Sequence, residues 1–300
     1  MKRLVRQSKS LIQSTFEKFG YRLRLVPLRK VFPQDVRNAG NDPRTLHYYT
    51  NDQVLLNAPI EKGYGLDHYS VNSDGSHPFV RAAMAGLNSG QPRNAIRSIL
   101  REYYNNIQPL DAAEWMGFSA EELPNLAGVP PWGRVYPWRS TTVEAMKKGI
   151  RATADLDNAQ GGRALSIEHG WRSFGPVSND IIEIETNRIY NLVEAVQRHG
   201  IKRDDRPGGD VGAIALVNDD GDWRWLVEFG GEHRVPVFSA LGYNEIPIRV
   251  RLVIYRKDVS LWPNVFNGLY SKYAALEVFD RYFSAEVPEI ASDYLDAIDE

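Results

Sequence analysis

Residues 211–242 impose the strongest constraint on the fold, because two strands, a glycine turn and a helix follow one another without long spacers. Val211–Val217 is a continuous apolar run that is typical of a buried strand. Asp219-Asp220-Gly221-Asp222 is a hairpin-type turn, and Trp223–Phe229 is the returning strand. Gly230 and Gly231 then allow the backbone to turn tightly into a helix. The pattern predicts an α+β fold.

Composition and charge exclude several classes of protein. The 300 residues include no cysteine, which excludes disulfides, thiolate catalysis and cysteine metal sites. A net charge of −2 provides no overall positive field for nucleic acid. No apolar run is long enough to span a bilayer, and a cytoplasmic location is expected.

Four segments are expected along the chain. Residues 1–30 form a basic amphipathic leader, 31–160 a mainly helical domain, 161–258 the domain with the glycine turn, and 259–300 a helix with an acidic tail. The leader lacks the apolar core and cleavage site of a secretory signal. It is expected either to lie on an anionic membrane surface, as in a membrane-peripheral protein, or to dock on its own domain or a partner.

Within the mainly helical domain, residues 31–75 are expected to form loops, since Asn, Asp, Gly and Pro interrupt every period. Helices are expected to follow from Pro78 to Leu87 and from Pro92 onward. Thr141 and Glu144 make a capping box for a later helix that reaches about Ala154. The polar stretch 155–162 is the expected domain boundary.

Beyond that boundary, the alternation of Asp180–Glu185 is typical of a strand. Arg188–His199 is amphipathic and stops at Gly200, which predicts a helix with a glycine cap. A further strand is expected at 246–254, and one long helix is expected to begin near Pro263.

The stretch Phe229-Gly230-Gly231-Glu232-His233-Arg234 has the layout of an anion-binding turn. Phosphate groups require convergent cations and backbone N–H donors, and arginine supplies two parallel donors. Because His233 and Arg234 stand at the start of the expected helix, this turn points to a nucleotide. The alternative is a surface patch of ion pairs.

Two stretches resemble the ParB/sulfiredoxin superfamily, over roughly residues 175–255. The helix that contains Arg188 and Asn191 is similar to the first nucleotide-contacting helix of that family, and residues 229–234 are similar to its phosphate-binding turn. The resemblance implies a mixed sheet with helices. It also implies a nucleotide site whose residues are Arg188, Asn191, Gly230, Gly231, His233 and Arg234.

The chain also departs from the patterns of that superfamily. Glu232 stands where sulfiredoxins carry their catalytic cysteine, so sulfiredoxin chemistry is excluded. A free-serine kinase of the same fold carries an acidic residue near the first helix and an aspartate in the turn, where this chain has Gly230. Glu183 and Glu185 fall near the position of the kinase's acidic residue by the first helix. Glu232 could replace the aspartate of its turn.

The resemblance to that kinase implies ATP, or another nucleoside triphosphate, with Mg²⁺ as cofactors. Glu185, or Glu183, would be the general base on an acceptor hydroxyl, and Glu232 would help to hold Mg²⁺. Arg188, His233 and Arg234 would offset the charge of the transferred phosphoryl group. The expected function is an ATP-dependent phosphotransferase that acts on a small molecule or a glycan precursor. The alternative to a catalytic role for Glu183 and Glu185 is that they lie on the outer face of a strand.

Two other functions remain open at this level. The first is a nucleotide-binding regulatory or scaffold protein, which the loss of the aspartate at Gly230 favours. The second is a DNA-associated ParB-like protein, against which the net charge and the short segment after Tyr255 argue. A helix-turn-helix spacing at 112–117 precedes Glu121 and Glu122 instead of basic residues.

Weaker candidates come from position and composition alone. Glu168, His169 and Arg172 lie just upstream of the nucleotide module and could belong to an acceptor site. The Trp132, Tyr136 and Trp138 cluster could stack on a sugar or pack between domains. His68, His77 and His169 lack a metal-ligand spacing and are interpreted as ordinary loop histidines.

Overall fold

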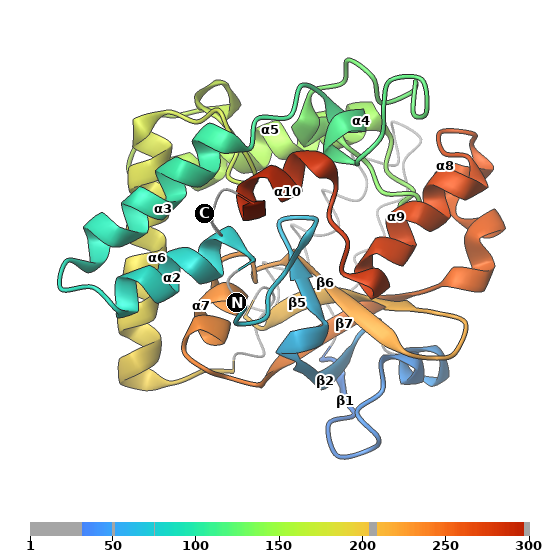
Figure 1. Cartoon of the computed structure of the whole chain (residues 1–300). Coiled ribbons are helices and arrows are strands. Elements are labelled where there is room, and N and C mark those ends of the chain that lie inside the picture. Colours follow the sequence, from blue (N-terminus) through green and yellow to red (C-terminus); the bar gives the residue numbers. More distant parts are fainter. Residues whose placement is uncertain (1–31, 50–51, 75, 204–208, 297–300) are drawn as a thin grey trace, which may run out of the picture. The chain divides into compact units, whose positions relative to one another are not determined.

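A computed structural model describes residues 32–49, 52–74, 76–203 and 209–296. The expected leader, residues 1–30, lies outside the described residues. Residues 33–300 form one compact unit. Within it, one sheet is covered by helices on both faces (Figure 1).

The sheet has seven strands in the order β1-β2-β7-β5-β6-β3-β4. Parallel pairs (β5 with β7, β3 with β6) and antiparallel pairs (β5 with β6, β2 with β7) both occur, which confirms a mixed sheet and an α+β chain. The strands are β1 (Gln34–Asp35), β2 (Val54–Pro59), β3 (Gly63–Gly65), β4 (Tyr69–Ser70), β5 (Val211–Val217), β6 (Trp223–Phe229) and β7 (Glu245–Tyr255).

The prediction of loops over 31–75 is wrong, because this stretch supplies four strands of the sheet. Strand β2 pairs along its whole length with β7, which is about 190 residues later in the chain (Val54 opposite Val250). Such long-range pairing leaves no local period to read. Strands from both sides of the expected boundary at 155–162 therefore share one sheet, and that stretch begins inside α5 (Val143–Gln160).

Alternating side chains of β5 enter two different cores, since successive residues of a strand point to opposite faces. Val211, Ala213 and Ala215 belong to the core beneath α2 (Pro78–Leu87), α3 (Pro92–Asn106), α6 (Asn179–His199) and α7 (Arg234–Ala240). Ile214 and Leu216 belong to the core that includes α9 (Lys272–Ser284). Burial on both faces explains the unbroken apolar run of β5.

The structure confirms the expected bounds of α2, β5 and β6, and the end of α6 at Gly200. The strand expected at Asp180–Glu185 is wrong, because these residues form the first turns of α6. Ser178 caps this helix by accepting a hydrogen bond from the N–H of Ile181. The two isoleucines that suggested alternation, Ile182 and Ile184, are buried on the helix.

Two further helix predictions need adjustment. Thr142 rather than Thr141 caps α5, which continues to Gln160. The long helix expected from Pro263 is interrupted after α8 (Pro263–Phe266), and Ser271 caps a new helix, α9. Among the remaining helices are the short α4 (Ala112–Trp115) and the C-terminal α10 (Glu289–Asp296).

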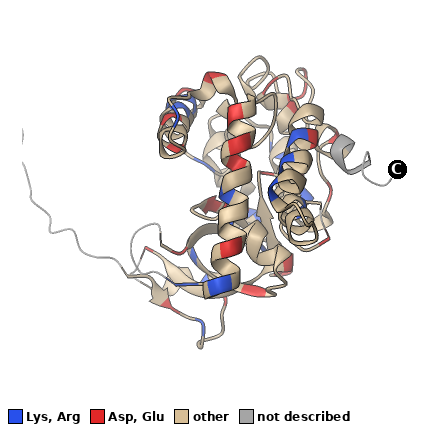
Figure 2. Cartoon of the chain, turned by 90° about the vertical axis from the view of Figure 1, so that its left-hand side faces the viewer, with Lys and Arg blue, Asp and Glu red and all other residues tan. Residues whose placement is uncertain are grey.

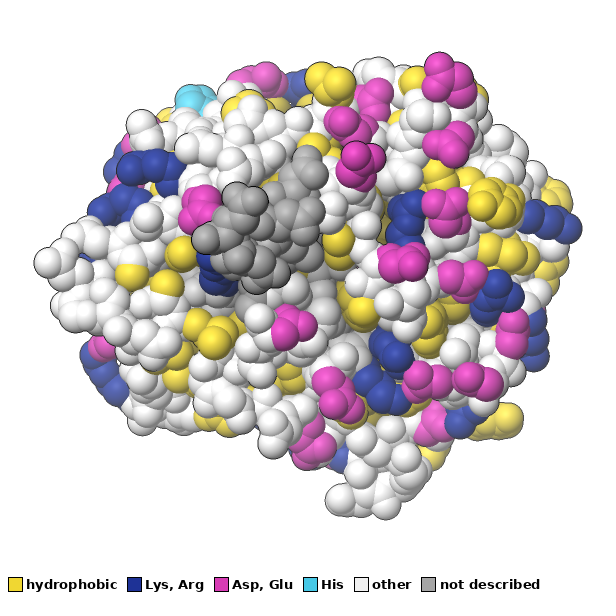
Figure 3. All heavy atoms as spheres, in the orientation of Figure 1, with side chains coloured by type: hydrophobic (Ala, Val, Ile, Leu, Met, Phe, Trp, Pro, Cys, Tyr) yellow, Lys and Arg dark blue, Asp and Glu magenta, His cyan; other side chains and the backbone are white. Residues whose placement is uncertain are grey.

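The described surface carries mixed charge. On the side that α6 crosses, both basic and acidic residues are present (Figure 2). Over α8 and α9, exposed apolar side chains such as Leu261, Phe266 and Tyr273 stand among charged ones (Figure 3). Within the described residues, no helix combines the length and the apolar character needed to cross a membrane.

Candidate functional site

The turn between β6 and α7 depends on two glycines. Gly230 has φ = +67°, in the left-handed region that side chains disfavour. Gly231 is buried, and a Cβ there would lie 2.8 Å from methyl groups of both Val211 and Val227. The sheet therefore touches the turn directly, and α7 begins three residues later at Arg234.

Helix α6 presents a buried carboxylate to this turn. Glu185 is 2 % exposed, and its Oε1 accepts a hydrogen bond of 2.7 Å from Nη1 of Arg188. Its Oε2 contacts Nε2 of His233, whose ring stacks on Phe79 at 5.2 Å. Burial raises the pKa of Glu185, but His233 and Arg188 outweigh it and lower this pKa to about 2. Glu185 is therefore ionised and holds the side chains of Arg188 and His233 in place.

A polar hollow of about 240 Å³ lies over the glycine turn. Arg172 enters it with Nη1 2.5 Å from Oδ2 of Asp157, and Arg188 donates to the carbonyl oxygen of Asp157 at 2.7 Å. The hollow is lined by Asp157, Gln160, Arg172, Arg188, Gly230, Glu232, His233 and Arg234. Three guanidinium groups and an imidazole around a glycine turn form a setting suited to an anion.

Arg234 supports the backbone of this turn. Its Nε donates to the carbonyl oxygen of Gly230, and its Nη1 donates to that of Gly209 at 2.5 Å. These contacts connect the start of α7 to the residues before β5. Arg234 therefore fixes the shape of the hollow in addition to lining it.

Glu232 lies where the hollow meets a second cavity. It lines both the hollow and this second, larger cavity, as Arg172 also does. Its Oε2 is buried and has no hydrogen-bond partner within the part of the chain that the structure describes. Burial raises the pKa of the Glu232 carboxyl, and the negative charge of Asp67 raises it further. Together they outweigh Arg172 and Arg134, which lower this pKa.

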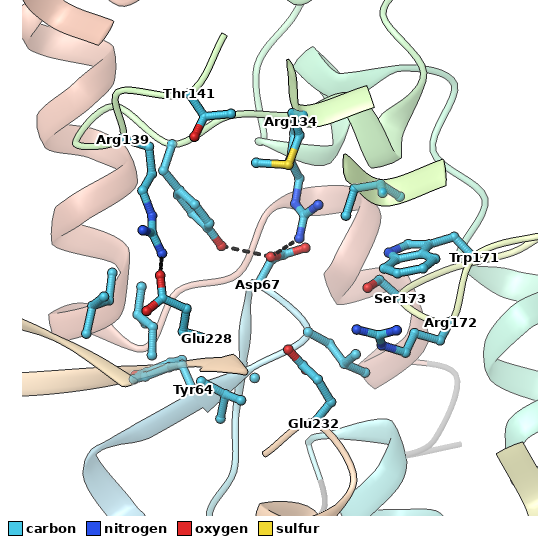
Figure 4. A pocket seen from close by; sticks show the side chains of 18 residues that line it. Tyr64, Asp67, Arg134, Arg139, Thr141, Trp171, Arg172, Ser173, Glu228 and Glu232 are labelled. Carbon is cyan, nitrogen blue, oxygen red and sulfur yellow. Dashed lines mark hydrogen bonds and ion pairs between the residues drawn. The ribbon is translucent and has the colours of Figure 1, made fainter. Parts of the chain in front are cut away.

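The larger cavity has a volume of about 330 Å³ (Figure 4). Asp67 stands on its wall and accepts hydrogen bonds from the Tyr136 hydroxyl and the Trp115 indole, both at 2.9 Å, while Arg134 pairs with it. Leu66 and Asp67 have φ of +45° and +74°. Non-glycine residues adopt such angles only where the surroundings enforce them, often at functional sites.

A second ion pair lies elsewhere on the cavity wall. Glu228 on β6 pairs with Arg139 and with Arg251 of β7. Thr141 and Tyr64 line the same cavity (Figure 4). The wall also includes apolar side chains, among them Met146, Ile150 and Leu226.

The structure brings together most of the predicted site residues: Glu185, Arg188, Gly230, Gly231, Glu232, His233 and Arg234. Glu183 and Asn191 are not among them. Glu183 forms an ion pair with Arg97 of α3, Asn191 is exposed, and neither lines the hollow or the cavity. The reason is helical geometry, because positions 183 and 185 lie about 200° apart around α6.

Sequence reasoning had proposed Arg172 and Tyr136 only from position and composition, and both line the larger cavity. The other residues of those two groups, Glu168, His169, Trp132 and Trp138, do not. No sequence motif points to several polar residues of the site: Asp67, Arg134, Arg139, Asp157 and Glu228. They come from loops, a helix and a strand that are far apart in the chain.

Within the described residues, no group of three or more His, Asp or Glu side chains is placed to hold a metal ion. Asp157 and Glu232 are the two carboxylates of the hollow. Mg²⁺ commonly binds through one or two carboxylates together with the phosphates of a nucleotide. A cation in the hollow would therefore need ligands in addition to these two carboxylates, one of which, Asp157, already pairs with Arg172.

Comparisons with known proteins find no matching family model, no matching curated protein and no matching solved structure. The geometry of the hollow and the cavity is therefore the basis for any assignment of function.

Proposed function

We propose that this chain is an ATP-dependent phosphotransferase with a ParB/sulfiredoxin-like nucleotide site, acting on a hydroxyl group of a small molecule. One observation carries the proposal: Arg172 and Glu232 line both the basic hollow and the larger cavity. Two ligands bound in these spaces would meet at this pair of side chains. A donor and an acceptor must meet in this way for direct transfer.

The hollow is the donor site in this proposal. Arg172, Arg188 and His233 line this hollow together with Gly230, which has no side chain to obstruct phosphate oxygens. Mg²⁺ would neutralise phosphate charge, and of the two carboxylates of the hollow Asp157 would contact it, which leaves Glu232 for the acceptor.

Glu232 takes the role of general base, in place of Glu185. The Glu185 carboxylate is occupied by Arg188 and His233, and its low pKa makes it a weak base. The free Oε2 of Glu232 can accept the proton of an acceptor hydroxyl. In the transfer, the acceptor oxygen bonds to the γ-phosphorus, the bond from that phosphorus to the bridging oxygen breaks, and ADP leaves.

Calorimetric titration of ATP, ADP, CTP and GTP with Mg²⁺ tests the donor site. Wild type should bind at least one nucleotide, and Arg188→Ala should weaken this binding at least tenfold. Arg198→Ala is the matched control, because Arg198 lies on the same helix with an exposed side chain paired to Glu194. If no nucleotide binds, or if both variants bind like wild type, the proposal is rejected.

Two alternatives give different results. A regulatory or scaffold protein would bind nucleotide but transfer no phosphate to any acceptor and hydrolyse slowly. A DNA-associated protein would shift duplex DNA at physiological salt, which the mixed charges on the α6 side do not favour (Figure 2). A cytoplasmic enzyme remains the proposal, and peripheral membrane contact through residues 1–30 stays a prediction.

A further inference from the structure

The charges of the larger cavity are already paired within the protein. Asp67 pairs with Arg134, and Glu228 pairs with Arg139. Arg172, at the junction with the hollow, pairs with Asp157. A cavity whose guanidinium groups are matched by carboxylates has no excess positive charge for an anionic ligand. The electrostatics therefore disfavour an anionic occupant.

Several buried polar atoms around this cavity nevertheless lack partners. Among the described residues, Nε of Arg134, Nε of Arg172 and Nε1 of Trp171 are donors without an acceptor, and Trp171 is only 6 % exposed. Oε2 of Glu232 is an acceptor that no described residue donates to. Buried polar groups are rarely left unpaired in native proteins. A ligand with several oxygen atoms and at least one hydroxyl donor would complete this set.

The size and the wall of the cavity restrict the ligand further. Its volume of about 330 Å³ lies near the lower end of the range of roughly 300–1,000 Å³ for small-molecule sites. Apolar side chains, including Ile150 and Leu226, share the wall with the polar groups. A sugar ring presents hydroxyls around its rim and C–H groups on its faces, which matches both kinds of wall.

We propose that the larger cavity binds an uncharged polyol of monosaccharide to disaccharide size, with one hydroxyl donated to Glu232 and ring or hydroxyl oxygens accepting from Trp171 and Arg172. Its role as phosphoryl acceptor depends on the proposed function, whereas its binding does not. The carbohydrate would occupy the side of Glu232 opposite the nucleotide.

The test measures binding without nucleotide, by saturation-transfer NMR and calorimetry on the full chain. The probes are glucose, N-acetylglucosamine, myo-inositol and maltose, with glucose 6-phosphate and gluconate as anionic counterparts. At least one uncharged probe should bind, and more tightly than the anionic ones. Trp171→Phe removes the indole donor but keeps an aromatic ring, and should weaken binding by about 3- to 10-fold.

Trp223→Phe is the matched control, since Trp223 is a half-buried tryptophan at the start of β6 that does not line the cavity. It should bind the sugar like wild type. Thermal melting of both variants verifies that they are folded. The proposal is overturned if no uncharged probe binds, if the anionic probes bind better, or if Trp171→Phe binds like wild type.

This experiment separates the two proposals. Sugar binding without any nucleotide binding would reject the phosphotransferase and leave the polyol site standing. Nucleotide binding without sugar binding would reject the polyol site and leave the nucleotide site standing.

Discussion

Glu185 holds His233 in place across the gap between α6 and the glycine turn, and the same carboxylate binds Arg188 through its other oxygen. One buried acid thereby orients side chains from two elements that are about 45 residues apart in the chain. It is a positioning residue for the hollow, since it is buried and does not line that space.

Glu185→Gln should lower the free energy of unfolding by roughly 1.5–3 kcal/mol at neutral pH, because charged hydrogen bonds to Arg188 and His233 are lost from a buried position. Urea denaturation measures the change. Glu183→Gln is the control two residues away on α6, where the carboxylate pairs with Arg97 near the surface and the expected cost is below about 1 kcal/mol. Equal effects of the two variants would contradict the role of Glu185.

The stabilisation that Glu185 provides should decrease as pH falls. The pKa of Glu185 is about 2 in the folded chain, against an ordinary value of 4.5. The unfolded chain therefore takes up a proton first, and the contribution of Glu185 is full above pH 4.5 and is lost as pH falls towards 2. In urea titrations of wild type and Glu185→Gln, the difference in stability should shrink over this interval. A constant difference would argue against the ion pairs.

Glu232→Gln should separate stability from activity. The folded chain raises the pKa of this carboxyl, so the ionised form costs stability as pH rises above 4.5. The variant avoids this cost, and its melting temperature should equal or exceed that of wild type at neutral pH, with a gap that widens from acidic to neutral pH. Phosphate transfer should fall roughly 100- to 10,000-fold because the general base is lost. Full activity of this variant would reject the assigned role.

Gly231→Ala should destabilise the chain by about 1–3 kcal/mol, since the added methyl group would meet Val211 and Val227 at 2.8 Å. Nucleotide binding should weaken with it, because the turn must move away from β5. Gly90→Ala is the matched control, where an added methyl group has no neighbour within 4 Å. Denaturant midpoints and calorimetry on both variants give the comparison. Unchanged nucleotide binding by a folded Gly231→Ala would remove the turn from the site.

The parts of the fold that sequence could predict are those with local signals. The hairpin of β5 and β6 follows from an apolar run, an Asp-Gly turn and a second run, and the structure reproduces its bounds. Helix α2 follows from a proline at its first position. Strands β2 and β3 could not be predicted, because their stability comes from partners that are far away in the chain.

The candidate site divides in the same way. Arg188, Glu232 and His233 lie in stretches with a readable order of elements, so sequence placed them together. Asp67 and Arg134 lie in separate loops, and only the folded chain brings them into contact. The role expected of Glu185 as a base assumed an exposed carboxylate, whereas burial between Arg188 and His233 makes it an anchor.

The stretch from Val54 to Gly65 borders the three central strands on both sides, with β2 against β7 and β3 against β6. The half of the chain that contains the glycine turn therefore depends on the other half for the neighbours of its outer strands. A fragment that starts at residue 161 would carry β5, β6 and β7 with two open edges, and open edges recruit strands from other molecules. Fusion or truncation designs that keep only the glycine-turn half should yield aggregates.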